Sequence, residues 1–209
     1  MRKTVRYGQV TLAIETAIGA GGVSLLCGQD ELASSNGGVS RAEEVLTGIE
    51  RVIAEAAATL ADVDLIAVSI GPGSFTGIRV GIATALGIRT SLNVRCVGVS
   101  SLKAMSISSS KGTCICVLPL GRGNYAAQEF SADNTNEQSK PFVIREQELS
   151  TLFGERSDVK FLLHADANVD GPLPANVVSC PDVLATLIGR SAFAGNGNET
   201  LEPLYLRKE

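Results

Sequence analysis

The chain has 209 residues, of which 44% are hydrophobic and 19% are charged, an ordinary balance for a soluble globular protein. This length is enough for one large domain or two small lobes. The formal net charge of −4 lacks the basic excess of proteins that bind nucleic acid directly, so any role in RNA chemistry is expected to run through a partner. Five cysteines without disulfide or zinc spacing indicate a reduced, cytoplasmic protein, and a single histidine excludes a zinc peptidase with paired histidines. No segment approaches a membrane span.

Three short strands are expected at the start of the chain, at residues 10–14, 23–27 and 31–34. The tight connections between them favour an antiparallel meander. A Ser-x-x-Glu capping box at residues 40–43 then opens a helix, and apolar residues continue at helical spacing to residue 60.

A strand–turn–helix unit follows, and the rest of the chain is organised around it. Residues 63–70 are mostly apolar and predict a buried strand, residues 71–77 contain three glycines and a proline and predict a sharp turn, and residues 78–92 predict a helix. The turn lacks the Gly-Lys-Ser/Thr of a Walker loop, and its third glycine comes one residue too late for a dinucleotide fingerprint. Ser74, Thr76 and the helix N-terminus can still hold a phosphate, so an anion site and a structural or docking turn both remain open.

The helix after the turn has a row of small residues, Gly77, Gly81 and Ala85, on one face. Glycine inside a soluble helix costs roughly 1 kcal/mol relative to alanine, so close approach of another backbone is expected to offset that cost. The neighbour can be a helix of the same domain or a helix of another chain. If it is another chain, we expect Gly81→Leu to weaken association and leave the monomer folded.

A strand at residues 94–99 and a short helix to about residue 107 complete the order β-β-β-α-β-α-β-α. This order is typical of a ribonuclease-H-like domain, the building block of actin and sugar kinases. A Ser-rich boundary predicts a first lobe at 1–108 and a smaller α/β lobe at 109–209, which includes a C-terminal helix and a docked tail. The expected fold is therefore α/β and two-lobed, actin-like, with mixed sheets, flanking helices and a reduced second lobe.

An actin-like ATPase needs carboxylates at the ends of its first strands to hold magnesium and to orient water. Glu15 is a candidate ligand, although a lone carboxylate at a strand end is more often a solvated surface group. Residues 118–123, where the second lobe begins, contain no carboxylate. His164 ends an apolar run and is interpreted as structural, so no catalytic residue is predicted.

The run from Ser69 to Gly81, Ser-Ile-Gly-Pro-Gly-Ser-Phe-Thr-Gly-Ile-Arg-Val-Gly, closely resembles the hallmark of the bacterial TsaB (YeaZ) family. The resemblance also covers residues 12–16 and 97–102, and it returns weakly at 203–207. Family members take part in making threonylcarbamoyladenosine in tRNA. They are described as catalytically silent relatives of TsaD, which transfers the threonylcarbamoyl group to adenosine 37 of tRNAs decoding ANN codons.

Three positions depart from the family pattern, and each departure removes a polar group. Glu15 stands in an Ile-Asp-Thr-like stretch, Arg41 stands at the start of a His-Ser-Glu motif, and Leu120–Asn124 falls where an Asp-Ala-Arg-Arg-x-Glu-Val-Tyr motif is common. These departures move the chain further from catalysis and put in doubt the contacts that the family makes there.

The resemblance implies a non-catalytic scaffold that pairs with a TsaD-like transferase through its first lobe, joined by a TsaE-like ATPase. It implies no cofactor in the isolated chain, with ATP or ADP and a divalent metal possible in partner subunits, and contact with tRNA only indirectly. A homodimer is possible when the partner is absent. The alternative is a small actin-like kinase or ATPase that uses Glu15 and the Gly-rich turn, and nucleotide binding would discriminate the two. The expected partner-binding residues are Gly73, Phe75, Gly77, Arg79, Gly81, Ala85, Val45 and Ile49.

Overall fold

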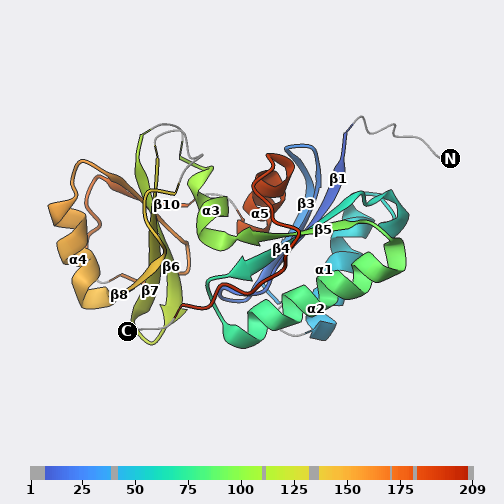
Figure 1. Ribbon diagram of the computed structural model, residues 1–209, viewed down its shortest axis with the longest axis horizontal. Helices are drawn as coiled ribbons and strands as arrows, with labels where there is room; N and C mark the ends of the chain where they lie inside the picture. Colours follow the sequence, from blue (N-terminus) through green and yellow to red (C-terminus); the bar gives the residue numbers. More distant parts are fainter. Residues whose placement is uncertain are drawn as a thin grey trace.

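The computed structural model describes residues 8–38, 42–109, 112–131, 137–169, 171–180 and 183–206. Two five-stranded sheets lie one after the other along the longest axis, each with its own helices, and the short helix α3 lies between them (Figure 1). The expected α/β, two-lobed fold is confirmed. The predicted capping residues Ser40 and Arg41 lie outside the described ranges.

The first sheet has the strand order β3-β2-β1-β4-β5. Its first three strands are antiparallel neighbours, as the short connections predict, and β4 and β5 run parallel to β1. The strands are β1 (Val10–Glu15), β2 (Gly22–Cys27), β3 (Asp30–Asn36), β4 (Leu65–Gly71) and β5 (Arg95–Ser100).

Helices cover both faces of this sheet, because side chains along its central strands alternate between two apolar clusters. Leu12 and Ile14 of β1 pack with the helices α1 (Ala42–Glu55) and α2 (Phe75–Leu92). Ala13, between them, packs with α3 (Ser101–Ser106) and α5 (Leu184–Phe193) on the opposite face. The helices α1 and α2 therefore lie on the same side of the sheet, as expected for consecutive right-handed crossovers.

The second sheet has the strand order β10-β9-β6-β7-β8. The helix α4 (Glu146–Glu155) covers its outer face through Leu149 and Phe153. Its inner face packs on α3 and so joins the core of the first lobe. The strands are β6 (Cys114–Gly121), β7 (Asn124–Phe130), β8 (Phe142–Arg145), β9 (Lys160–Leu163) and β10 (Val177–Ser179).

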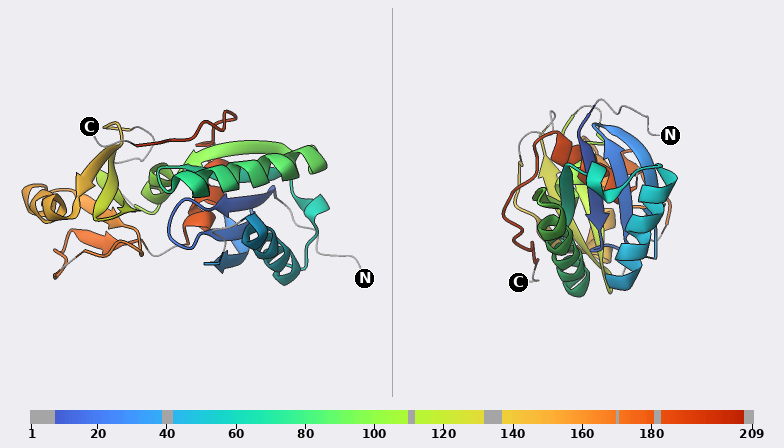
Figure 2. Two further views of the ribbon diagram at one scale, coloured as in Figure 1. Left: turned by 90° about the horizontal axis from the view of Figure 1, so that it is seen from below. Right: turned by 90° about the vertical axis from the view of Figure 1, so that its right-hand side faces the viewer.

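The C-terminal helix and tail do not belong to the second lobe, which corrects the expected division at residue 108. The helix α5 packs on β1 and β2 of the first sheet (Figure 1). The tail after it exchanges two backbone hydrogen bonds between Asn198 and Gly98, of 2.7 and 2.9 Å, and then crosses the first lobe (Figure 2). The first sheet needs this cover, because α3 spans only six residues and cannot shield the face alone. Within the described ranges, no helix is both long and apolar enough to cross a membrane.

Candidate functional site

The Gly-rich turn between β4 and α2 lies directly against the loop that follows β1. The backbone N–H of Ser74 donates to the carbonyl oxygen of Ala17 at 2.7 Å. A Cβ atom at Gly73 would overlap this same oxygen, and one at Gly77 would overlap the carbonyl oxygen of Thr16. Glycine is therefore required at both positions by the close approach of the chain's own backbone.

The polar groups of this turn are largely engaged within the chain. The Ser74 hydroxyl accepts from the backbone N–H of Gly77 at 3.2 Å and so caps α2. The Thr16 hydroxyl donates to the carbonyl oxygen of Gly77 at 2.7 Å, and Pro72 has no N–H to offer. Thr76 is exposed on the first turn of the helix. This arrangement favours a structural or docking turn over an anion site.

The small-residue face of α2 points inward, so its interpretation as the surface that meets another chain is wrong. A Cβ atom at Gly81 would overlap the Thr16 hydroxyl and lie 3.4 Å from Val68 Cγ2. Ala85 is fully buried, and so are Val45 and Ile49 on the neighbouring helix α1. These residues hold α1 and α2 against the first sheet and are not accessible to a partner.

The opposite face of α2 is the accessible one. Phe75 is 53% exposed and Leu86 is 40% exposed, and Leu46 of α1 is 51% exposed. A surface hollow of about 350 Å³ lies along α2, and its lining residues are Phe75, Thr76, Arg79, Val80, Ala83 and Thr84. Of the expected partner residues, Phe75 and Arg79 are therefore exposed, and Gly73 is half-buried. The sequence analysis missed Leu46, Leu86 and Ala83, although positions 75, 79, 83 and 86 share one helical face.

The C-terminal tail contributes to this face of α2. The backbone N–H of Leu204 donates to the carbonyl oxygen of Ile70 at 2.7 Å, which holds the tail against the end of β4. The Tyr205 ring then packs on Phe75, with ring centroids 4.9 Å apart. The expectation of a docked tail is confirmed as far as residue 206.

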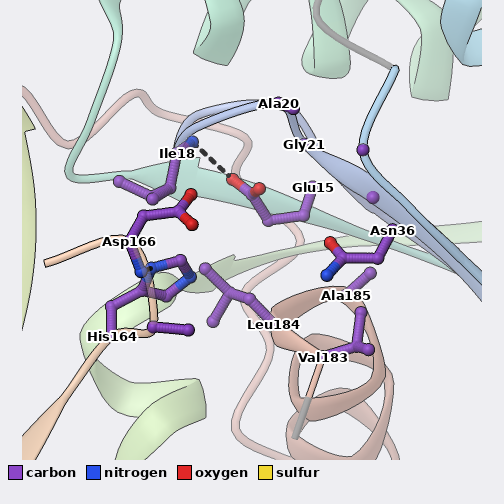
Figure 3. Close-up of a pocket in the computed structure, with 13 residues that line it drawn as sticks. Glu15, Ile18, Ala20, Gly21, Asn36, His164, Asp166, Val183, Leu184 and Ala185 are labelled. Carbon is purple, nitrogen blue, oxygen red and sulfur yellow. Dashed lines mark hydrogen bonds between the residues drawn. The ribbon is translucent and has the colours of Figure 1, made fainter. Parts of the chain in front are cut away.

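A second candidate region is a cavity of about 170 Å³ between the lobes (Figure 3). Glu15 enters it from the end of β1 and is only 2% exposed. Its carboxyl group accepts from the backbone N–H of Ala17 at 2.6 Å and of Ile18 at 3.0 Å. Burial raises the pKa of Glu15 to about 8, the two backbone donors lower it, and the charge of Asp166 raises it. The interpretation of Glu15 as a solvated surface group is therefore wrong, and the carboxyl is protonated at neutral pH.

The second lobe contributes polar groups to the same cavity, which the sequence analysis did not foresee. Asp166 and His164 follow β9, and Figure 3 shows the Asp166 carboxylate and Glu15 facing the same space. The backbone N–H of Asp166 donates to His164 Nδ1 at 3.1 Å, and burial lowers the pKa of His164, so the imidazole is neutral. The available signal was the position of Asp166 just beyond a strand of a parallel pair, where ligand-binding groups gather.

The cavity offers little capacity for nucleotide chemistry. Its volume is well below the roughly 300–1,000 Å³ of typical small-molecule sites. A protonated Glu15 also lacks the charge that would hold magnesium. In the part of the chain that the structure describes, no three His, Cys, Asp or Glu side chains are grouped so that they could hold a metal ion.

Comparisons with known proteins agree with these observations on the fold. A family model described as TsaD, tRNA N6-adenosine threonylcarbamoyltransferase, matches residues 28–126. The YeaZ structure from Pseudomonas aeruginosa has a TM-score of 0.69 at 19% identity and covers 95% of this chain and 100% of that one, which shows the same fold.

Two curated relatives match shorter segments. The Escherichia coli tRNA threonylcarbamoyladenosine biosynthesis protein TsaB is 33% identical over 64 residues, which are 31% of this chain and 28% of that protein. An uncharacterized protein of Mycobacterium tuberculosis is 39% identical over 66 residues, which are 32% of this chain and 31% of that protein. The matches therefore span about a third of the length of these relatives.

Proposed function

Because these matches support assignment of the chain to the TsaB (YeaZ) family, we propose that it is a non-catalytic subunit in threonylcarbamoyladenosine synthesis. In this role it binds a TsaD-like transferase that modifies adenosine 37 of tRNAs decoding ANN codons. The observation that carries the proposal is the outward face of α2, where Phe75 and Leu86 are exposed beside Arg79. Exposed apolar patches rimmed by polar groups mark protein interaction sites.

The kind of partner follows from the family-model match. The matched residues, 28–126, include α1 and α2, so a TsaD-like subunit is expected to have corresponding helices. Two related lobes can then pair through like surfaces about an approximate two-fold axis. A second copy of this chain can use the same surface when the TsaD-like subunit is absent.

The inter-lobe cavity supports the non-catalytic part of the proposal. Its volume of about 170 Å³ and the protonated Glu15 leave no evident place for a magnesium-bound nucleotide. ATP or ADP and a divalent metal therefore belong to partner subunits, one of them a TsaE-like ATPase. The chain itself contacts tRNA only through these partners, in keeping with its net charge of −4.

The test is reconstitution of the tRNA modification with the TsaD-like subunit encoded in the same genome. We expect the modification to require this chain, and the chain alone to produce none. We also expect full activity from the Asp166→Asn variant, because the cavity has no role in the chemistry. The proposal is wrong if the chain does not bind the TsaD-like subunit, or if modification stops in that variant while the complex still forms.

A small actin-like ATPase remains the competing function, because carboxyl groups from both lobes, Glu15 and Asp166, line one cavity. Calorimetry of the isolated chain with Mg-ATP distinguishes the two. We expect no saturable binding at millimolar nucleotide. Saturable binding that is lost in Asp166→Asn favours the ATPase.

A further inference from the structure

Arg79 occupies a fixed position on the exposed face of α2. Its guanidinium carbon lies 3.7 Å from the centroid of the Phe75 ring, which is cation–π stacking distance. Its Nε donates to the hydroxyl oxygen of Tyr205 at 3.1 Å. The two rings that hold the guanidinium come from opposite ends of the chain, one from the helix and one from the C-terminal tail.

The charge of Arg79 is not neutralised within the described chain. None of the ion pairs formed among the described residues includes Arg79. The 18 residues of α2 contain Arg79 and Arg89 and no acidic residue. The terminal guanidinium nitrogens therefore present open donors at the surface, which are complementary to a carboxylate in bidentate geometry.

The hollow beside Arg79 is apolar over most of its wall. Phe75, Val80 and Ala83 supply carbon surface, and Thr76 and Thr84 close the sides. Its volume of about 350 Å³ leaves room for an apolar side chain from outside. A cation next to such a hollow fits a helix that carries an acidic and an apolar residue one turn apart.

We propose that Phe75, Arg79 and Tyr205 form the anchor of the docking surface, in which Arg79 binds a carboxylate on a helix of the TsaD-like subunit. This inference rests on the proposed function for the identity of the occupant. Stacking on Phe75 and the Tyr205 hydroxyl hold the guanidinium in place before binding, which lowers the entropy lost on association. Arginine and aromatic residues in such settings are enriched among interface hot spots. The C-terminal tail is thereby part of the interface.

The test is isothermal titration of the full chain with the TsaD-like subunit, for the wild type and three variants. We expect Arg79→Met and Tyr205→Ala each to raise Kd by roughly 10-fold or more, the range of hot-spot residues. Arg89→Met is the matched control, because it removes the same charge from the same helix, and its Kd should stay within about 2-fold of the wild type. Salt should weaken the wild type more than Arg79→Met, since the cation supplies the screened attraction. Melting curves check that each variant is folded.

The outcomes separate this inference from the function on which it rests. If wild-type protein does not bind the TsaD-like subunit, the proposed function fails first. If wild type binds and folded Arg79→Met and Tyr205→Ala bind equally well, the anchor is wrong and the scaffold role stands. If Arg79→Met instead abolishes a homodimer in sedimentation and leaves the TsaD-like complex intact, the occupant is a second copy and the proposal is overturned.

Discussion

The two faces of α2 differ in what they contact and in the residues that they use. The inward face has Gly77, Gly81 and Ala85, where any larger side chain would overlap the chain's own backbone or the Thr16 hydroxyl. The outward face has Phe75 and Leu86, exposed next to Arg79. A row of small residues therefore reports that something approaches closely, and here the neighbour is the first sheet. The face available to a partner is the one with large side chains.

The comparison is tested most severely by Gly81→Leu. We expect this variant to lose about 3 kcal/mol or more of its free energy of unfolding, because the new side chain must displace Thr16, whose hydroxyl is held by Gly77. Urea unfolding measures the change. The sequence analysis expected a folded monomer, so a wild-type unfolding midpoint would restore the outward assignment of this face.

The seat of the inward face is the loop that Glu15 organises, and its stability should depend on pH. Because the folded pKa of about 8 lies above the usual 4.5, the folded state binds more protons between these values. The free energy of unfolding should then fall as pH rises from about 4.5 to about 8, by at most about 1.4 kcal/mol per unit from this group.

Unfolding of wild type and Glu15→Gln in parallel across this range isolates the contribution. The amide can still accept from the two backbone N–H groups but does not titrate. We expect the variant to gain stability relative to wild type as pH rises. Parallel curves for the two proteins would show that Glu15 has an ordinary pKa.

The smallest expected stability effect is a matched pair of alanine substitutions on the same helix. A Cβ atom at Gly87 would have no neighbour within 4 Å, so Gly87→Ala should stabilise the protein by roughly 0.5–1 kcal/mol through helix propensity. Gly81→Ala should destabilise it, since its Cβ atom would overlap the stiff, hydrogen-bonded Thr16 side chain. Thermal unfolding of the two variants gives the sign of each effect. Equal shifts in the same direction would erase the difference between the faces.

Local patterns in the sequence predict much of the first lobe. The strand order, the Gly-rich turn and the small-residue face of α2 all follow from turn chemistry and periodicity within about 20 residues. The identity of the neighbour does not follow, because a glycine row encodes a distance and not a partner. The return of α5 to the first sheet and the meeting of Glu15 with Asp166 were missed for the same reason: each joins residues about 150 or more positions apart.

The central claim is that the inward face of α2 holds the fold and the outward face binds the partner. Leu86→Glu tests it most directly, because this side chain is exposed and lies outside the anchor of Phe75, Arg79 and Tyr205. Titration calorimetry of this variant with the TsaD-like subunit should give a Kd raised by about 10-fold or more, with an unchanged melting temperature, since a desolvated charge on an apolar interface is costly. A Kd equal to that of the wild type, in a folded variant, would contradict the claim.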